Sequence, residues 1–250
     1  MEVHHHAHTS RKKWTHYLWE FVMLFLAVFC GFLAEYQLEH TIEHQRAKKY
    51  ASNLLDELKK DTARLTYLMN LASVTSGKLD SLTMLIKDPG HQAVTSGMLY
   101  YYADNVLNVT YFASHNSTLE QLKNSGSLRM MKINVGQMIS EYDKKIRELE
   151  KEYGLSKSEF EKMETLHFKV FDVYTLEELF TDDTSRITRD SVFRLNTLYV
   201  TKDREMMNEY AGWVKFEANI YRMQSKEYLA PIRKNAEELI ATLKKEYHLK

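Results

Sequence analysis

Cysteine and the turn-forming residues are scarce in this sequence. Its 250 residues include 8 glycines, 2 prolines and 1 cysteine. A β-domain of this size needs many more turn residues. Since Cys30 is alone, no disulfide can form within the chain, and cysteine usage says nothing about the redox compartment. The abundant Leu, Lys, Glu, Met and Ala are good helix formers, so the sequence predicts an all-α fold.

An excess of charge of either sign is also missing. Lys and Arg together number 34, as do Asp and Glu. Nucleic-acid-binding proteins carry a basic excess or a basic stripe, and this sequence has neither. We therefore expect no nucleic-acid partner. The apolar fraction of 44% is ordinary for a globular protein, so a substantial core can form.

One long apolar run stands out near the N-terminus. Residues 21–34 carry no charge, and aromatic residues flank the run at Trp14, Tyr17, Trp19 and Tyr36. A transmembrane helix needs about 20 mostly apolar residues, and aromatic residues gather at both membrane interfaces. The run predicts a transmembrane helix over residues 17–37, with the lipid bilayer as its surroundings. The alternative is a core helix of a soluble protein.

The charges beside this run predict its orientation. Three basic residues at positions 11–13 precede it, and three glutamates follow before the next basic residue. By the positive-inside rule, residues 1–16 form a cytoplasmic tail and residues 38–250 lie outside the cytoplasm. In a Gram-negative bacterium this means an inner-membrane protein with a periplasmic domain. A signal peptidase cut after Ala34 would place bulky Phe32 at a position that requires a small residue, so we expect an uncleaved signal anchor.

The region after the anchor has helical periodicity almost throughout. Apolar residues recur at steps of three, four or seven from Leu54 to Ile86, and polar Thr62 and Thr75 fill the gaps in this stripe. Asp88-Pro89-Gly90 predicts a stop. The patterns predict helices over residues 36–87, 91–107, 118–124, 134–153, 156–180 and from about 201 onward. The first continues the transmembrane helix, and together they predict an elongated antiparallel helical bundle.

Local signals predict where several of these helices begin, end or bend. Asn116 or Ser117 caps the helix that ends at Ser125-Gly126, and Ser156 or Ser158 caps a helix after a stop at Gly154. We expect Gly126 to adopt a positive φ, with Leu122 and Leu128 packed inward. Pro231 removes a backbone donor and predicts a kink in the last helix.

Catalytic motifs are few. His40-Thr-Ile-Glu43-His44 matches the H-x-x-E-H pattern of one class of metalloprotease. A zinc protease also needs a third ligand and an enclosed cleft, whereas this segment lies on a polar helix just past the membrane. We interpret it as a juxtamembrane helix that contains histidines. The acidic residues elsewhere are expected on solvated helix faces, so the sequence predicts no catalytic residue, cofactor or metal site.

The anchor itself carries a candidate contact surface. One face of the expected helix holds Glu20, Leu24, Ala27, Gly31 and Ala34. Small residues spaced like Ala27 and Gly31 let a second helix approach closely, and an acidic residue at the edge of a span usually faces protein. This anchor stripe predicts contact with another transmembrane helix. The alternative is accidental spacing, with Glu20 reaching the headgroups.

Two segments carry a likeness to a known family. They are Leu54-Leu-Asp-Glu-Leu-Lys-Lys-Asp61, together with the span before it, and Ser117-Thr-Leu-Glu-Gln-Leu-Lys-Asn-Ser-Gly-Ser-Leu-Arg129. In these places the chain resembles a family of uncharacterised single-pass proteins of Bacteroidota. Ala34-Glu-Tyr-Gln37 departs from the asparagine and tryptophan usual at that family's anchor exit. The resemblance implies a membrane-anchored helical architecture and no particular chemistry.

The sequence favours a non-enzymatic structural or accessory subunit. Such a protein presents its periplasmic bundle to other membrane or periplasmic proteins, or pairs with a second copy through the anchor. The alternative is a periplasmic sensory or ligand-binding module that acts with a separate signalling partner, since the N-terminal tail is too short for an output domain. An enzyme is the third possibility.

Overall fold

The computed structural model describes residues 14–87, 94–180 and 188–250. Within these ranges the chain is helical and has no strand, apart from an isolated bridge between Phe171 and Val200. This confirms the predicted all-α class. The chain divides into two compact units, Met1–Tyr50 and Ala51–Lys250.

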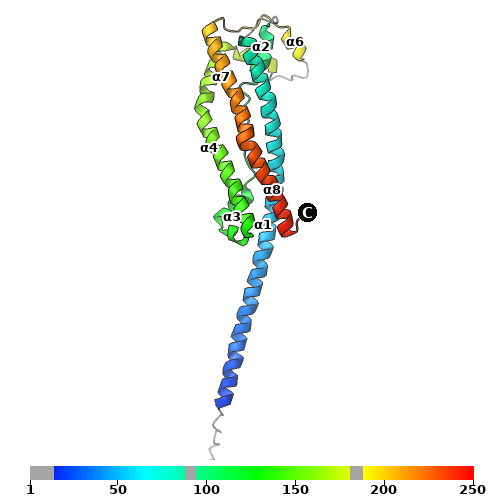
Figure 1. Cartoon of the computed structure of the whole chain (residues 1–250), viewed down its shortest axis with the longest axis vertical. Helices are drawn as coiled ribbons and strands as arrows, with labels where there is room; N and C mark the ends of the chain where they lie inside the picture. The colour runs from blue at the N-terminus through cyan, green and yellow to red at the C-terminus, as the bar shows by residue number, and fades with distance from the viewer. Residues whose placement is uncertain (1–13, 88–93, 181–187) are drawn as a thin grey trace, which may run out of the picture. The chain divides into compact units, whose positions relative to one another are not determined.

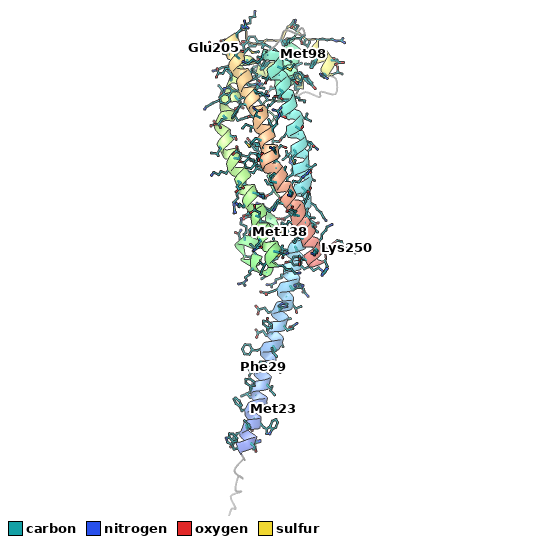
Figure 2. The ribbon with its side chains drawn as sticks, viewed as in Figure 1. Met23, Phe29, Met98, Met138, Glu205 and Lys250 are labelled. Carbon is teal, nitrogen blue, oxygen red and sulfur yellow. The ribbon has the colours of Figure 1, made fainter. Side chains whose placement is uncertain are left out.

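Helix α1, Trp14–Lys87, is 74 residues long, and its first part makes up the described portion of the first unit. Among the described residues it is the one helix long and apolar enough to cross a membrane, and none of its most apolar window is buried. Figure 2 shows Met23 and Phe29 projecting from its surface, where they are 65% and 48% exposed. The predicted apolar helix is therefore present, and its side chains have no protein core around them.

In the second unit, α1 presents its predicted apolar stripe to the core. The buried members of this stripe are Leu54, Leu58, Leu65, Leu68, Ala72, Leu79 and Leu82. The polar residue in the gap between Leu58 and Leu65 is Asp61, which is fully buried, and not Thr62, which is only partly buried. Thr75 is buried as expected.

Helix α2, Ser96–Ala103, is shorter than predicted and packs closely on α6, Arg189–Phe193. Thr95 caps α2 by accepting a hydrogen bond from the Met98 amide at 3.2 Å. A Cβ on Gly97 would lie 1.8 Å from the carbonyl oxygen of Val192, so only glycine allows this approach. The predicted stop at residues 88–90 lies outside the described residues.

Helix α3, Ser117–Asn124, has the predicted bounds to within a residue. Gly126 follows it with φ +66°, as predicted, and leads into the 3-10 helix η2, Ser127–Met130. Glycine adopts this left-handed conformation at little cost because it has no Cβ. Leu122 is fully buried, and Leu128 is half-buried.

Helix α4, Ile133–Val170, contradicts the predicted stop at Gly154. It runs unbroken through this glycine, and Ser156 donates from Oγ to the carbonyl oxygen of Glu152 within the helix instead of capping a new one. Glycine lowers helix stability by only about 1 kcal/mol. Burial of Leu149 before it and Met163 after it outweighs that cost. Helix α5, Val173–Phe180, follows after a two-residue break.

The last helical run has three parts: α7, Arg204–Met223, the π-helical η4, Gln224–Leu229, and α8, Ala230–Tyr247. Asp203 caps α7 by accepting from the amides of Glu205 and Met206. Pro231 stands in the first turn of α8, directly after the π-helical segment. A wider turn of this kind accommodates the backbone hydrogen bond that is lost because proline has no N–H donor.

In the second unit the long helices share one core. Helix α4 packs against α7 and α8, while α2 and α6 lie at one end of this unit and α3 and the C-terminus at the other (Figure 1). Near the α2 end, aromatic rings form the centre of the core: Tyr100, Phe171 and Tyr210, with His167 among them. Tyr100 is fully buried, whereas Tyr101 and Tyr102 are partly exposed, as expected for adjacent residues on a helix.

Candidate functional site

The five residues of the anchor stripe lie on one face of α1 and are all exposed. At 100° per residue, their positions span about 80° of the helix circumference. A Cβ added at Gly31 would meet no atom within 4 Å, so this position is open to a neighbour. Glu20 pairs along its own helix, with Oε1 3.0 Å from His16 Nε2. The stripe therefore exists as a surface, and its contact with a second helix stays a prediction.

The H-x-x-E-H segment lies within α1, where His40 and His44 are exposed and Glu43 is partly buried. No group of three or more His, Cys, Asp or Glu residues within the described ranges is placed to hold a metal ion. The segment stands on one helix, and its interpretation as a polar juxtamembrane helix stays a prediction.

Two buried carboxylates on α1 form a site that sequence reasoning missed. Glu57 and Asp61 are 9% and 0% exposed, although the sequence predicted acidic residues on solvated faces. They stand one turn apart and face the segment that enters α3. The prediction was wrong for these two residues because hydrogen-bond donors from distant parts of the chain replace water around a carboxylate inside the core.

Glu57 takes the place of a side-chain cap for α3. Its carboxylate accepts hydrogen bonds from the Ser117 hydroxyl, from the Thr118 hydroxyl at 2.8 Å and from the Thr118 amide at 3.0 Å. Asn116, the residue at the predicted cap position, makes no side-chain cap hydrogen bond. A carboxylate suits this place because helix N-termini expose amide donors and carry partial positive charge.

Asp61 binds the residues around that helix start. Its Oδ1 accepts from the His115 amide at 2.8 Å and lies 2.7 Å from His115 Nδ1, and its Oδ2 accepts from the Tyr142 hydroxyl at 2.7 Å. Burial, together with the charge of Asp61, raises the pKa of Tyr142, which therefore stays a neutral donor. The two carboxylates thus join α1, the start of α3 and α4.

These contacts connect the two segments that carry the family likeness. Glu57 and Asp61 belong to the first segment, and Ser117 and Thr118 begin the second. One signal in the sequence could have found the site. Asp61 occupies a position of the apolar stripe, so a carboxylate there has to face the core. Both oxygens of Asp61 accept hydrogen bonds from protein donors, so this cluster holds the start of α3 and α4 against α1.

A second buried polar pair lies in the aromatic core. His167 is 0% exposed, and its Nδ1 lies 2.8 Å from the Tyr210 hydroxyl. Its Nε2 has no hydrogen-bond partner among the described residues. Burial lowers the pKa of His167 to about 4, so the imidazole is neutral near pH 7. A buried polar atom without a partner is unusual in folded proteins.

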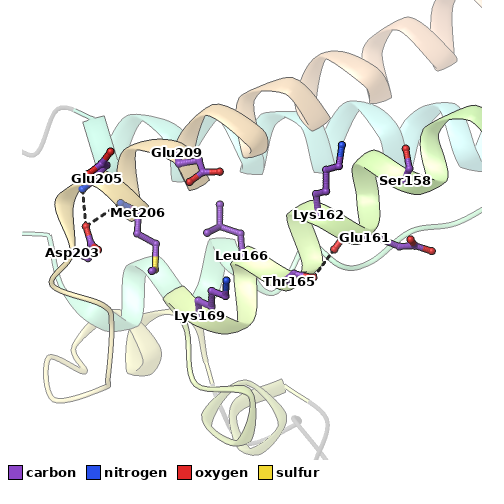
Figure 3. Close-up of a pocket in the computed structure, with 10 residues that line it drawn as sticks. All are labelled: Ser158, Glu161, Lys162, Thr165, Leu166, Lys169, Asp203, Glu205, Met206 and Glu209. Atoms are coloured by element: carbon purple, nitrogen blue, oxygen red, sulfur yellow. Dashed lines mark hydrogen bonds between the residues drawn. The ribbon is translucent and has the colours of Figure 1, made fainter.

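The described residues of the second unit line several hollows. The one in Figure 3 has a volume of about 610 Å³ and lies between α4 and the start of α7, where Lys162 and Glu209 come from facing helices. Its lining holds four carboxylates and two lysines, so it favours no single charge. A hollow of about 640 Å³ beside η2 is lined by three basic residues, Arg129, Lys144 and Arg147, and by the carboxylate of Glu141. A third, of about 350 Å³, has His167 on its lining.

No protein-family model, curated protein or solved structure matches this chain.

Proposed function

We propose that this protein is a non-enzymatic accessory subunit of a bacterial inner membrane. Residues 17–37 form its single transmembrane helix, residues 1–16 face the cytoplasm, and residues 38–250 are periplasmic. The helices of the second unit form an antiparallel bundle that is offered to membrane or periplasmic proteins, including a second copy. The motif likeness to single-pass Bacteroidota proteins supports the same architecture.

The observation that carries this proposal is the complete exposure of the apolar part of α1. Leu24 and Phe32 are both 69% exposed, and none of the apolar window contacts a protein core. Exposing so much apolar surface to water is costly, at about 25 cal/mol per Å². A lipid bilayer removes this cost without requiring any partner protein.

The anchor stripe gives the proposal its point of contact. Lipid tails are as apolar as leucine, so helices associate in a bilayer through close packing and polar contacts. Ala27 and Gly31 leave room for an approaching backbone on this face. Glu20, already paired with His16, can extend the polar contact to a partner. Phe25 lies on the other side, in a ring stack with Phe21 and Phe29.

Cross-linking through Cys30 tests this contact. Cys30 is exposed and next to Gly31, so it reports a second copy in native membranes. Gly31→Leu fills the open position and should reduce cross-linking and recovery of co-purifying proteins, while the matched Phe25→Leu should change neither. Glu20→Gln should weaken the contact while keeping its size. If cross-linking and recovery of co-purifying proteins are equally intact in Gly31→Leu and Phe25→Leu, the transmembrane helix only holds the protein in the membrane and makes no contact through this face.

A second candidate function is a ligand-binding module. The observation that favours it is the 350 Å³ cavity with His167 on its lining, whose Nε2 has no hydrogen-bond partner among the described residues.

A further inference from the structure

The cavity beside His167 lies wholly within the second unit. It is an open hollow lined by the turn after α2, the C-terminal end of α4 and the helix α5, and its volume is about 350 Å³. This size is at the lower end of the range for small-molecule sites. Its lining residues are Asp104, Leu107, Asn108, His167, Phe168, Val173, Leu176, Glu177 and Phe180.

Most of the lining is apolar and partly aromatic. Leu107, Leu176 and Val173 provide aliphatic surface, and Phe168 and Phe180 provide two phenyl rings. Phe168 remains 45% exposed although it stands at the end of a core helix. A wall of this kind removes apolar ligand surface from water, and phenyl faces also attract a cation.

The charged groups on the lining are of one sign. Asp104 and Glu177 are acidic, and no lysine or arginine is among the described residues that line the cavity. The half-buried Asp104 carboxylate accepts no hydrogen bond from the described residues. Burial raises the pKa of Asp104, and the charge of Lys78 opposes this effect. The Lys78 ammonium is held by the side-chain oxygen of Asn105 at 2.9 Å instead of pairing with Asp104.

His167 completes the polar part of the lining. It is fully buried, its Nδ1 is held by the Tyr210 hydroxyl, and its Nε2 has no partner in the described part of the chain. Because the imidazole is neutral near pH 7, it does not offset the acidic residues. The cavity therefore combines an apolar wall with a partly desolvated carboxylate that receives no hydrogen bond from the described residues.

We propose that this cavity binds a small organic amine whose ammonium group pairs with Asp104 and whose apolar body lies against Phe168, Leu176 and Phe180. The ammonium supplies hydrogen-bond donors to the Asp104 carboxylate, which receives none from the described residues, and adds a charge-assisted contact at closer range than Lys78. A carboxylate ligand is repelled by the same residue, and a neutral alcohol gains only the apolar contact. The proposal develops the second candidate function and is independent of the anchor contact.

Phenethylamine is a suitable probe, with phenethyl alcohol and phenylacetate as neutral and anionic analogues of equal bulk. Titration calorimetry of the full chain in phosphatidylcholine nanodiscs should show saturable binding of the amine at pH 7. It should show at least about tenfold weaker binding of both analogues, the difference expected for one charge-assisted contact. Equal binding of all three compounds, or binding of none, would overturn the proposal.

Two pairs of variants locate the site. Asp104→Asn keeps the side-chain shape and should weaken amine binding about tenfold. The exposed Glu178→Gln on α5 should leave binding unchanged. Val173→Trp fills the cavity from a position that is 37% exposed and should abolish binding, whereas Tyr174→Trp, at a 74% exposed position off the lining, should not.

Near-UV circular dichroism first establishes that each variant is folded. If folded Asp104→Asn and Val173→Trp proteins bind phenethylamine as tightly as their controls, the amine does not occupy this cavity. Cys30 cross-linking of the same samples is expected to be unchanged in every case, so the outcome for this site is distinguishable from the outcome for the anchor.

Discussion

Removing the buried carboxylate of Asp61 should destabilise the second unit more than any other single acidic substitution on α1. In Asp61→Ala, the Tyr142 hydroxyl and the His115 amide lose their acceptor. Tyr142 is 3% exposed, so water cannot easily replace the carboxylate. His115 has a half-exposed side chain, and its donors can return to solvent more readily.

The expected cost is about 3–5 kcal/mol, the range for removing one partner of a buried charged network. This is a large part of the 5–15 kcal/mol by which domains are usually stable. For a unit of this length each kcal/mol lowers the melting temperature by about 2–4 °C, so the loss should be roughly 6–20 °C. Tyr142→Phe removes only one donor and should cost about 1–2 kcal/mol.

Thermal unfolding of the full chain, followed by the near-UV circular dichroism of its tyrosines, measures this loss. Asp56→Ala is the matched control, because that side chain is 68% exposed and has one weak pair, with Lys59 at 3.4 Å. It should shift the melting temperature by less than about 2 °C. If Asp61→Ala shifts it no further than Asp56→Ala, the buried network does not join these helices.

Two other predictions follow from single positions. Gly126→Val should lower the free energy of unfolding by about 1–2 kcal/mol because φ is +66° there. Gly154→Ala, inside α4 and with nothing within 4 Å of the new Cβ, should raise it by up to about 1 kcal/mol. Urea titration measures both changes, and changes of the same sign would contradict the assigned conformations. Burial raises the pKa of Glu217 to about 7, so the folded state keeps this proton while the unfolded chain releases it. Stability should therefore fall as pH rises from about 4.5 to 7, by up to about 3 kcal/mol, and Glu217→Gln should match the parent at pH 4 but exceed it at pH 8. A stability difference that is independent of pH would refute this.

Sequence patterns predicted features that depend on local chemistry. The apolar stripe of α1, the bounds of α3 and the positive φ of Gly126 all follow from residues within a few positions of one another. Each of these features is decided by side-chain periodicity or by backbone sterics. Neighbouring residues are sufficient to specify them.

Features that depend on distant contacts were missed. Gly154 has the sequence pattern of a helix end, but α4 continues through it because the helix is packed against the core on both sides of this glycine. The place of Asp61 in the apolar stripe indicates that it faces the core, but its donors, His115 and Tyr142, come from 54 and 81 positions away. The cavity beside His167 likewise needs three segments to meet. No local pattern reveals which distant donors or walls will be present.

The location of the bundle is tested most directly by fusing alkaline phosphatase after Lys250 in a Gram-negative host. This enzyme is active only after export from the cytoplasm. The proposed topology predicts an active fusion that stays with the membrane fraction, and Arg11, Lys12 and Lys13 all changed to Glu should reduce that activity. A well-expressed but inactive fusion would contradict the periplasmic bundle.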